Sequence, residues 1–367
     1  MKIITFYLPQ FHTFPENDEW WGKGFTEWKN VKGAFPQYKG HYQPRIPLND
    51  NYYDLTDTNV LKWQAKLARE NGVYGFCFYH YWFDGKLLME KPMENLLNDP
   101  TIEINYCICW ANETWTKAWA QHSKEILIQQ TYSNEKEWDR HFNYLLPFFK
   151  DKRYIRMNSK PIMVIYRPEQ IENLENMLTY WNNKAKAEGL EGLCFISQQS
   201  EYNIETDSAG YLFDYGIEYQ PDRAMKSLQV QLPMLIKRGL NRAFIKFGFK
   251  RTKYSTYTFN YDKVWKTVLH TLPQNEKSIP GAFVDWDNTP RYKEYARIFD
   301  GYTPEKFEKY LEQQIIHARN EYKKDMIFMF AWNEWGEGGY LEPDEKYGEK
   351  TLKAIKTALI NTNEFPY

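Results

Sequence analysis

Two glutamates stand three positions apart near the C-terminal end of the sequence, in the segment AWNEWGEGGYLEP at residues 331–343. Glu334 and Glu337 lie there among tryptophans, glycines and a tyrosine, where a carboxylate loses hydration unless a partner compensates for it. Paired carboxylates are the groups that cleave glycosidic bonds, because one donates a proton to the departing oxygen and the other acts as base or nucleophile. Apolar neighbours also raise a carboxyl pKa, which keeps the proton on the acid.

Both carboxylates reach one pocket only if the chain turns between them, since residues i and i+3 of a strand point to opposite faces. We expect the strand to end near Asn333, and the glycines at 336, 338 and 339 to allow a turn that brings the acids together. The alternative is a purely structural turn, in which the acids bind backbone N–H groups or pair with Lys346.

Further polar and aromatic residues follow the other expected strands, at the ends where a barrel enzyme builds its active site. We predict that the following residues bind substrate: Tyr7, Gln10, His12, His80, Tyr81, Trp82, Trp110, Asn112, Glu113, Glu218, Tyr219, Asp287, Arg291, Asn333 and Trp335.

Several of these residues have a second interpretation. Glu113 is also a candidate for catalysis or for a structural hydrogen bond. His12 and His80 have no partner at metal-ligand spacing, so packing among aromatic rings or contact with sugar is favoured over metal binding. Asp287 and Arg291 also have the spacing of a salt bridge within one loop.

The elements that position these residues alternate between short apolar runs and longer amphipathic segments, which is typical of a (β/α)8 barrel with parallel strands. We expect strands at Ile3–Leu8, Gly75–Tyr81, Ile104–Trp110, Pro161–Tyr166, Gly192–Ser197, Phe213–Tyr219, Gly281–Trp286 and Ile327–Trp332. We expect helices at Leu55–Asn71, Ser133–Lys150, Glu169–Glu188, Pro304–Lys323 and Glu349–Asn361.

Two long insertions interrupt this alternation. Pro9–Asp54 follows the first strand, and the stretch at about 220–280 follows the sixth, with helical patterns at Lys226–Arg238 and Tyr261–Leu272. Between those patterns lies the basic segment FIKFGFKRTKY, which we interpret as a solvated face. We treat residues 1–367 as a single domain.

Composition excludes some partners and favours others. The net charge is −1, so no basic field exists to bind nucleic acid or an anionic membrane. The chain carries 14 Trp, 29 Tyr and 23 Phe, and so many amphipathic rings suggest an aromatic cleft that suits sugars. Cys77, Cys107, Cys109 and Cys194 lie in apolar runs and are expected to be buried free thiols. No apolar stretch reaches the length of a membrane span and no leader is evident, which predicts a cytoplasmic protein.

The chain resembles the WbsX-type family of bacterial proteins, often found with O-antigen and other lipopolysaccharide genes and described as glycosyltransferases. FYLPQFH, FTEW, YGFCFYHYWF, CWANETW, KPIMVIYRP and FAWNEWGEG carry the resemblance. The chain is more distantly similar to family 99 glycoside hydrolases, which are barrel enzymes acting on α-mannosides.

In those hydrolases a motif of the form NEWHEG holds two essential glutamates, which match Glu334 and Glu337. The resemblance implies that Glu334 assists attack by the sugar 2-hydroxyl, giving a 1,2-anhydro sugar, and that Glu337 is the acid/base. It also implies substrate contacts for Tyr7, Asp287 and Arg291. Gly336 stands where the hydrolases have histidine, so mannose specificity does not transfer.

We therefore predict a retaining glycoside hydrolase or transglycosylase acting on a bacterial polysaccharide, with no cofactor and no metal. One rival is a glycosyltransferase, favoured by the family description and by a formal DxD match at Asp285–Asp287, but without a GxGxxG segment. The other rival is a carbohydrate-binding protein without catalytic activity.

Overall fold

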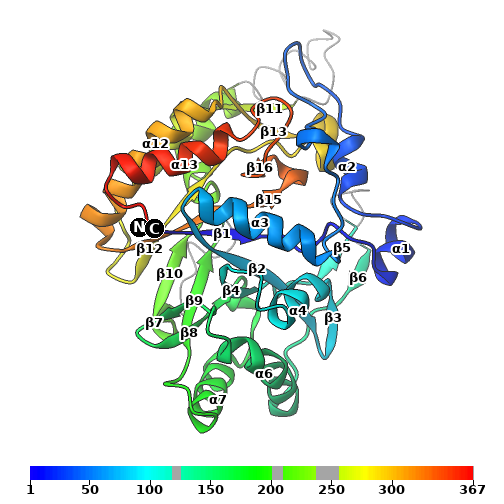
Figure 1. Ribbon diagram of the computed structural model, residues 1–367, viewed down its shortest axis with the longest axis vertical. Coiled ribbons are helices and arrows are strands. Elements are labelled where there is room, and N and C mark those ends of the chain that lie inside the picture. The colour runs from blue at the N-terminus through cyan, green and yellow to red at the C-terminus, as the bar shows by residue number, and fades with distance from the viewer. Residues whose placement is uncertain (118–124, 201–209, 237–255, 367) are drawn as a thin grey trace.

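Eight parallel strands close into a barrel in the computed structural model, which describes residues 1–117, 125–200, 210–236 and 256–366 (Figure 1). β1 pairs with both β14 and β2, which closes the sheet. The barrel strands are β1 (Lys2–Tyr7), β2 (Val73–Phe83), β4 (Asn105–Trp110), β8 (Lys160–Ile165), β9 (Cys194–Gln199), β10 (Tyr215–Glu218), β12 (Ser278–Phe283) and β14 (Met326–Phe330). Each predicted strand overlaps one of these, so the predicted (β/α)8 fold is confirmed.

Helices surround the barrel, with α6 and α7 on the opposite side from α12 and α13 (Figure 1). The helices are α1 (Pro15–Trp21), α2 (Trp28–Lys32), α3 (Thr58–Glu70), α4 (Lys91–Asn98), α6 (Glu135–Lys150), α7 (Leu174–Ala187), α8 (Asp222–Met225), α10 (Tyr261–His270), α11 (Thr289–Tyr292), α12 (Pro304–His317) and α13 (Lys350–Asn361). Single turns are η1 (Leu48–Asp50), η2 (Pro168–Gln170), η3 (Gly210–Leu212), η4 (Lys293–Tyr295), η5 (Ala318–Tyr322) and η6 (Trp335–Glu337).

The strands are buried along most of their length, as expected for a parallel sheet covered on both faces. All four cysteines are buried free thiols, as predicted. Short strands decorate the barrel: β3 (Lys86–Leu88), β5 (Trp115–Thr116), β6 (Ile126–Ile128), β7 (Arg156–Met157), β11 (Tyr257–Asn260), β13 (Arg297–Asp300), β15 (Asn333–Glu334) and β16 (Gly339–Tyr340).

The insertion after β1 contains α1 and α2, and α2 lies against η6 and α11 at the C-terminal end of the barrel. The insertion after β10 contains α8, a helical stretch at 228–236, β11 and α10. The helix predicted at Lys226–Arg238 is therefore observed in part. The basic segment FIKFGFKRTKY lies outside the described residues.

Candidate active site

The two glutamates belong to a short hairpin that follows the last barrel strand. β14 ends at Phe330, and β15 then pairs with β16 in antiparallel fashion, with Glu334 opposite Gly339. The turn η6 connects the two strands, and Gly338 closes it with a left-handed φ of 67°. Because the chain turns between them, Glu334 and Glu337 both line one cleft, as the spacing required. Lys346 lies over the rings of Tyr42 and Tyr347 instead.

Arg291, on α11, joins the two acids. Its Nη2 donates to Glu334 Oε1 at 3.0 Å, and its Nη1 lies 2.8 Å from Glu337 Oε1. Its Nε donates to Glu27 Oε1 at 2.9 Å, from the residue that precedes α2. One guanidinium therefore holds three carboxylates from two distant parts of the chain.

The pKa of Glu334 is raised to about 8, mainly by burial and also by the charges of Glu337 and Glu27, against the opposing charge of Arg291. The pKa shift follows from the burial of Glu334 and from three carboxylates sharing one cation. Glu334 is 2% exposed, whereas the Glu337 side chain keeps 19% of its surface open. Near neutral pH Glu334 is thus mainly protonated, and Glu337 is the more accessible acid.

The cleft in front of these acids has a volume of about 610 Å³ and largely aromatic walls. The predicted site residues that line it are Gln10, Tyr81, Glu113, Tyr219, Arg291, Glu334 and Glu337. Among the other lining residues, the aromatic ones are Phe14, Trp21, Phe25, Tyr79, Trp115, Tyr166, Tyr292 and Phe330. Burial raises the pKa of Glu113, and Arg167, at 3.5 Å, opposes that shift.

Tyr7 and Trp335 do not line the cleft but belong to a buried network beneath it. Trp335 Nε1 donates to Glu342 Oε2 at 2.7 Å, and its ring stacks on Tyr340. The Tyr7 hydroxyl donates to Gln64 Oε1 at 2.7 Å, and Gln64 in turn donates to Glu342 Oε1 at 2.6 Å. Burial, opposed by the hydrogen bonds that Trp335 and Gln64 donate, raises the pKa of Glu342 to about 7. The predicted substrate contacts of Tyr7 and Trp335 are therefore replaced by a supporting role.

Asn333 also supports the hairpin. Its Oδ1 accepts from the Leu8 N–H at 2.8 Å, and its Nδ2 donates to the Leu8 carbonyl at 3.0 Å. The side-chain amide therefore pairs with the backbone as another strand residue would, and it fastens the hairpin to the end of β1. Asn333 is fully buried and does not line the cleft.

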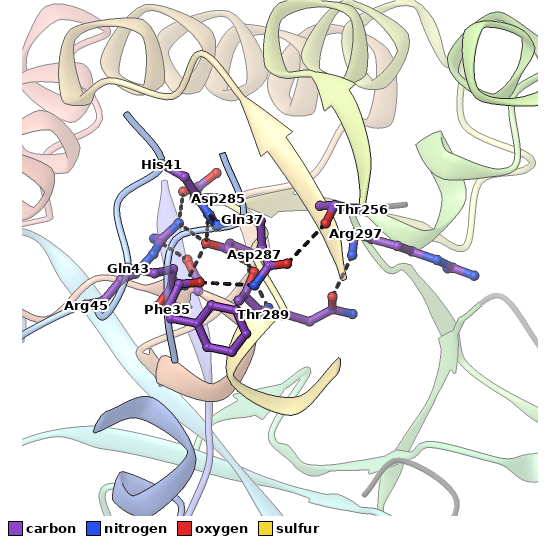
Figure 2. Close-up of polar contacts among 12 residues, drawn as sticks. Phe35, Gln37, His41, Gln43, Arg45, Thr256, Asp285, Asp287, Thr289 and Arg297 are labelled. Atoms are coloured by element: carbon purple, nitrogen blue, oxygen red, sulfur yellow. Dashed lines mark hydrogen bonds and ion pairs between the residues drawn. The ribbon is translucent and has the colours of Figure 1, made fainter. Parts of the chain in front are cut away.

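Asp287 lies behind the hairpin in a polar cluster with Asp285, facing His41, Gln43 and Arg45 (Figure 2). Its Oδ2 accepts from His41 at 2.8 Å and Gln43 at 2.7 Å, and its Oδ1 accepts from Thr289 at the start of α11. Burial opposes ionisation, but the His41 hydrogen bond and the Arg45 charge outweigh it and hold the Asp287 pKa at about 2.

This cluster also binds the backbone of the turn between Glu334 and Gly339. The Asp287 N–H donates to the Glu337 carbonyl at 2.7 Å, and Arg45 Nη1 donates to the Gly338 carbonyl at 3.1 Å. Asp287 therefore neither contacts the cleft nor forms the loop salt bridge that its spacing with Arg291 suggested. The two aspartates of the DxD match, Asp285 and Asp287, both pair with Arg45, which donates to Asp285 at 2.8 Å. Within the described residues, no group of three or more potential ligand side chains has the arrangement of a metal site.

The remaining predicted residues lie in structural contacts away from the cleft. His80 meets His141 between the barrel and α6, and burial lowers the His80 pKa to about 3. Trp82 donates to Glu137 and stacks on His141, and Trp110 donates to the Trp82 carbonyl.

Three further predicted residues are also placed outside the cleft lining. Asn112 bonds the backbone of Arg167 through both ends of its amide. Glu218 is fully buried against Arg223. His12 is buried, which lowers its pKa. None of the three residues lines the cleft.

Glu27 is the main charged residue of the cleft that sequence reasoning missed. It lies in the FTEW segment, where a single glutamate among aromatic residues shows no catalytic spacing. Its partner Arg291 is 264 positions away, so only the folded chain reveals the pair.

Comparison with known proteins supports the fold and indicates a family. The family model described as "Glycosyltransferase WbsX" matches residues 3–355. The "Uncharacterized protein WxcX" of Xanthomonas campestris pv. campestris strain B100 is 32% identical over 359 residues, covering 97% of this chain and 49% of that protein. The chain therefore spans about half the length of the curated relatives it matches.

Two solved structures share the architecture along the whole chain. The GH99 endo-alpha-mannosidase from Bacteroides thetaiotaomicron has a TM-score of 0.54 and 14% identity, with 98% of this chain and 97% of that chain covered. A structure described as "Glycoside hydrolase-like protein" has a TM-score of 0.60 and 14% identity, with 100% and 94% covered. At this identity the likeness is one of fold. Within the described residues, no helix has both the length and the apolar character that a membrane crossing requires.

Proposed function

The chain belongs to the WbsX glycosyltransferase family, and from that membership and the cleft we propose that it is a glycan-cleaving enzyme, a retaining glycoside hydrolase or transglycosylase using Glu334 and Glu337. The observation that carries the proposal is the pair of carboxylates held on one guanidinium in an aromatic cleft. Aromatic faces pack against the C–H faces of sugars, while the carboxylates supply proton transfer.

In the first step, Glu334 removes the proton of the sugar 2-hydroxyl, whose oxygen attacks the anomeric carbon. The glycosidic bond breaks, and Glu337 donates its proton to the departing oxygen. A 1,2-anhydro sugar results. Glu337 then takes a proton from water, or from an acceptor hydroxyl in transglycosylation, as that oxygen attacks the anomeric carbon. The three-membered ring opens, and Glu334 returns the proton to the 2-oxygen.

The environments of the two acids support this division of labour. In its ionised form, which is the minor form near neutral pH, a carboxylate with a raised pKa is a stronger base towards a hydroxyl, and this suits Glu334. Glu337 is more exposed, which suits a group that must meet both a leaving group and water.

The charge of the cleft favours an uncharged glycan over a nucleotide sugar. Among its described lining residues the acids are Glu27, Glu113, Glu334 and Glu337, and the cation is Arg291, which already binds three of them. A diphosphate carries negative charge and needs cations or a metal at its binding site. The family description nevertheless keeps a nucleotide-sugar-dependent glycosyltransferase as the second candidate.

The test is cleavage of defined bacterial oligosaccharides, followed by mass spectrometry, with NMR of the first anomer released. Glu334→Gln and Glu337→Gln should each lower the rate by about 10²- to 10⁴-fold. Glu345→Gln, which changes an exposed glutamate shortly beyond the hairpin, is the matched control and should keep full activity. If Glu334→Gln and Glu337→Gln both cleaved at the wild-type rate, the mechanism would be wrong. Calorimetric binding of a nucleotide sugar, with none of free oligosaccharides, would favour the glycosyltransferase.

A further inference from the structure

Glu27 is a third carboxylate at the catalytic pair, supplied by the insertion after β1. Its side chain is 6% exposed, and its Oε1 accepts from Arg291 Nε. Glu27 also accepts a long hydrogen bond of 3.4 Å from Asn30, within the first turn of α2. Because α2 lies against both η6 and α11, the contact couples the insertion to the two elements that carry the acids and their cation.

The geometry of the guanidinium gives this contact a specific consequence. Each of the three nitrogens of Arg291 meets a different glutamate: Nε meets Glu27, Nη2 meets Glu334 and Nη1 meets Glu337. The group is planar and its donors are fixed in direction, with a single hydrogen on Nε. A hydrogen bond at Nε therefore sets the orientation of the whole plane, and with it the directions in which the two Nη groups point.

Gly336 provides the space that this ion pair occupies. A Cβ atom at position 336 would lie 2.4 Å from Glu27 Oε1 and 2.9 Å from Arg291 Nε. Both separations are shorter than ordinary contacts, so a side chain at this position would displace the Glu27–Arg291 pair. The glycine between the two catalytic glutamates is thus matched to a residue more than 300 positions earlier in the chain.

Glu27 also acts on the pair through its charge. The negative charge of Glu27 raises the pKa of Glu334. The positive charge of Arg291 lowers that pKa, and Glu27 offsets part of this charge by pairing with Arg291. Removing the Glu27 charge therefore removes one effect that raises the Glu334 pKa and strengthens the Arg291 effect that lowers it. Glu334 would then lose its proton at lower pH.

We propose that Glu27 is a positioning residue of this active site, which orients Arg291 between Glu334 and Glu337, and that Gly336 leaves the room this arrangement needs. The inference rests on the proposed function for its catalytic consequence. Its structural part, the orientation of Arg291 by Glu27, stands independently of any substrate.

The test compares Glu27→Gln, Glu27→Asp, Gly336→Ala and the double variant Glu27→Gln/Gly336→Ala. Glu27→Gln should lower kcat/KM by about 10- to 100-fold, because a misplaced cation misplaces the acids. The rise of kcat/KM with pH should also move to lower pH by about one unit. Glu27→Asp keeps the charge and should recover part of both effects. Gly336→Ala should lower kcat/KM as Glu27→Gln does, but without the same pH shift, because Glu27 keeps its charge. The double variant should have a kcat/KM little lower than either single variant, because both changes break the same pair.

Glu16→Gln is the matched control, since Glu16 lies on α1 in the same insertion and pairs with Lys86 at the surface. Wild-type kcat/KM and an unshifted pH profile in folded Glu27→Gln would overturn the inference while leaving the proposed function intact. If wild type cleaves no glycan, the proposed function fails. The effect of Glu27 on the site is then tested by the free energy of unfolding in urea, measured at several pH values. In that case Glu27→Gln should lose less stability than wild type as pH rises from about 5 to about 8. An identical pH dependence in the two proteins would then overturn the inference.

Discussion

Replacing Glu334 with glutamine should make the protein progressively more stable than wild type as pH rises. The side chain is buried, and its pKa rises from the ordinary 4.5 to about 8 in the folded chain. The folded protein therefore binds a proton that the unfolded chain has already released. The stability that comes from holding this proton is complete below pH 4.5, and it is lost as pH rises until it passes about 8.

The magnitude follows from the same two pKa values. Each unit of pKa difference between folded and unfolded chain corresponds to about 1.4 kcal/mol. Relative to acid pH, the wild-type protein should lose about 3 kcal/mol at pH 7 and about 5 kcal/mol at pH 9 through this one group. Glutamine does not titrate, so Glu334→Gln should escape this loss.

Urea unfolding of wild type and Glu334→Gln at about pH 5, 7 and 9 measures the effect. The difference between the two proteins at a single pH also contains the altered hydrogen bond to Arg291, but the change of that difference with pH isolates the titration. A difference that stays constant from acid to alkaline pH would refute the assignment of a raised pKa to Glu334.

Three further outcomes are expected. Tyr7→Phe should cost about 1 kcal/mol through the lost hydrogen bond to Gln64 and leave kcat/KM nearly unchanged; a large loss of activity at full stability would instead place Tyr7 in contact with substrate. In wild type, kcat/KM should rise with pH towards about 8, because Glu334 must be ionised to act as the base; a fall through the same range would reassign it as the acid. Asp287→Asn should lower the free energy of unfolding by about 3 kcal/mol near neutral pH, since Arg45 loses a buried partner. That loss should shrink as pH falls from 3.8 towards the folded pKa of about 2, and urea unfolding that shows the same loss at about pH 3 would contradict it.

The barrel could be predicted from the sequence because each strand is a continuous apolar run and most crossovers contain a recognisable helix. The acid pair could also be predicted, since two carboxylates and three glycines within six residues leave few alternatives to a turn with both acids on one side. Both inferences depend on patterns that are local in the sequence, within each strand, each crossover or the turn that holds the two acids.

The facing of individual side chains at strand ends could not be predicted, because a shift of one residue reverses the face. Tyr7 illustrates this, since it points outward to Gln64 on α3 rather than towards the cleft. Glu27 illustrates a second difficulty, because its role is created by contact with an arginine on α11, in a different part of the chain. Asp287 had the right neighbours in sequence, yet its partners His41, Gln43 and Arg45 come from the insertion after β1.

The two hydrogen bonds between Asn333 and Leu8 make the hairpin that carries Glu334 and Glu337 sensitive to deamidation of one side chain. Only a primary amide can both accept from the Leu8 N–H and donate to the Leu8 carbonyl. Hydrolysis of that amide to a carboxylate would leave two acceptors facing each other and add a buried negative charge to the hairpin that carries Glu334 and Glu337. Asn333 is fully buried and is therefore shielded from water. The packing that positions the hairpin thus also slows hydrolysis of this amide.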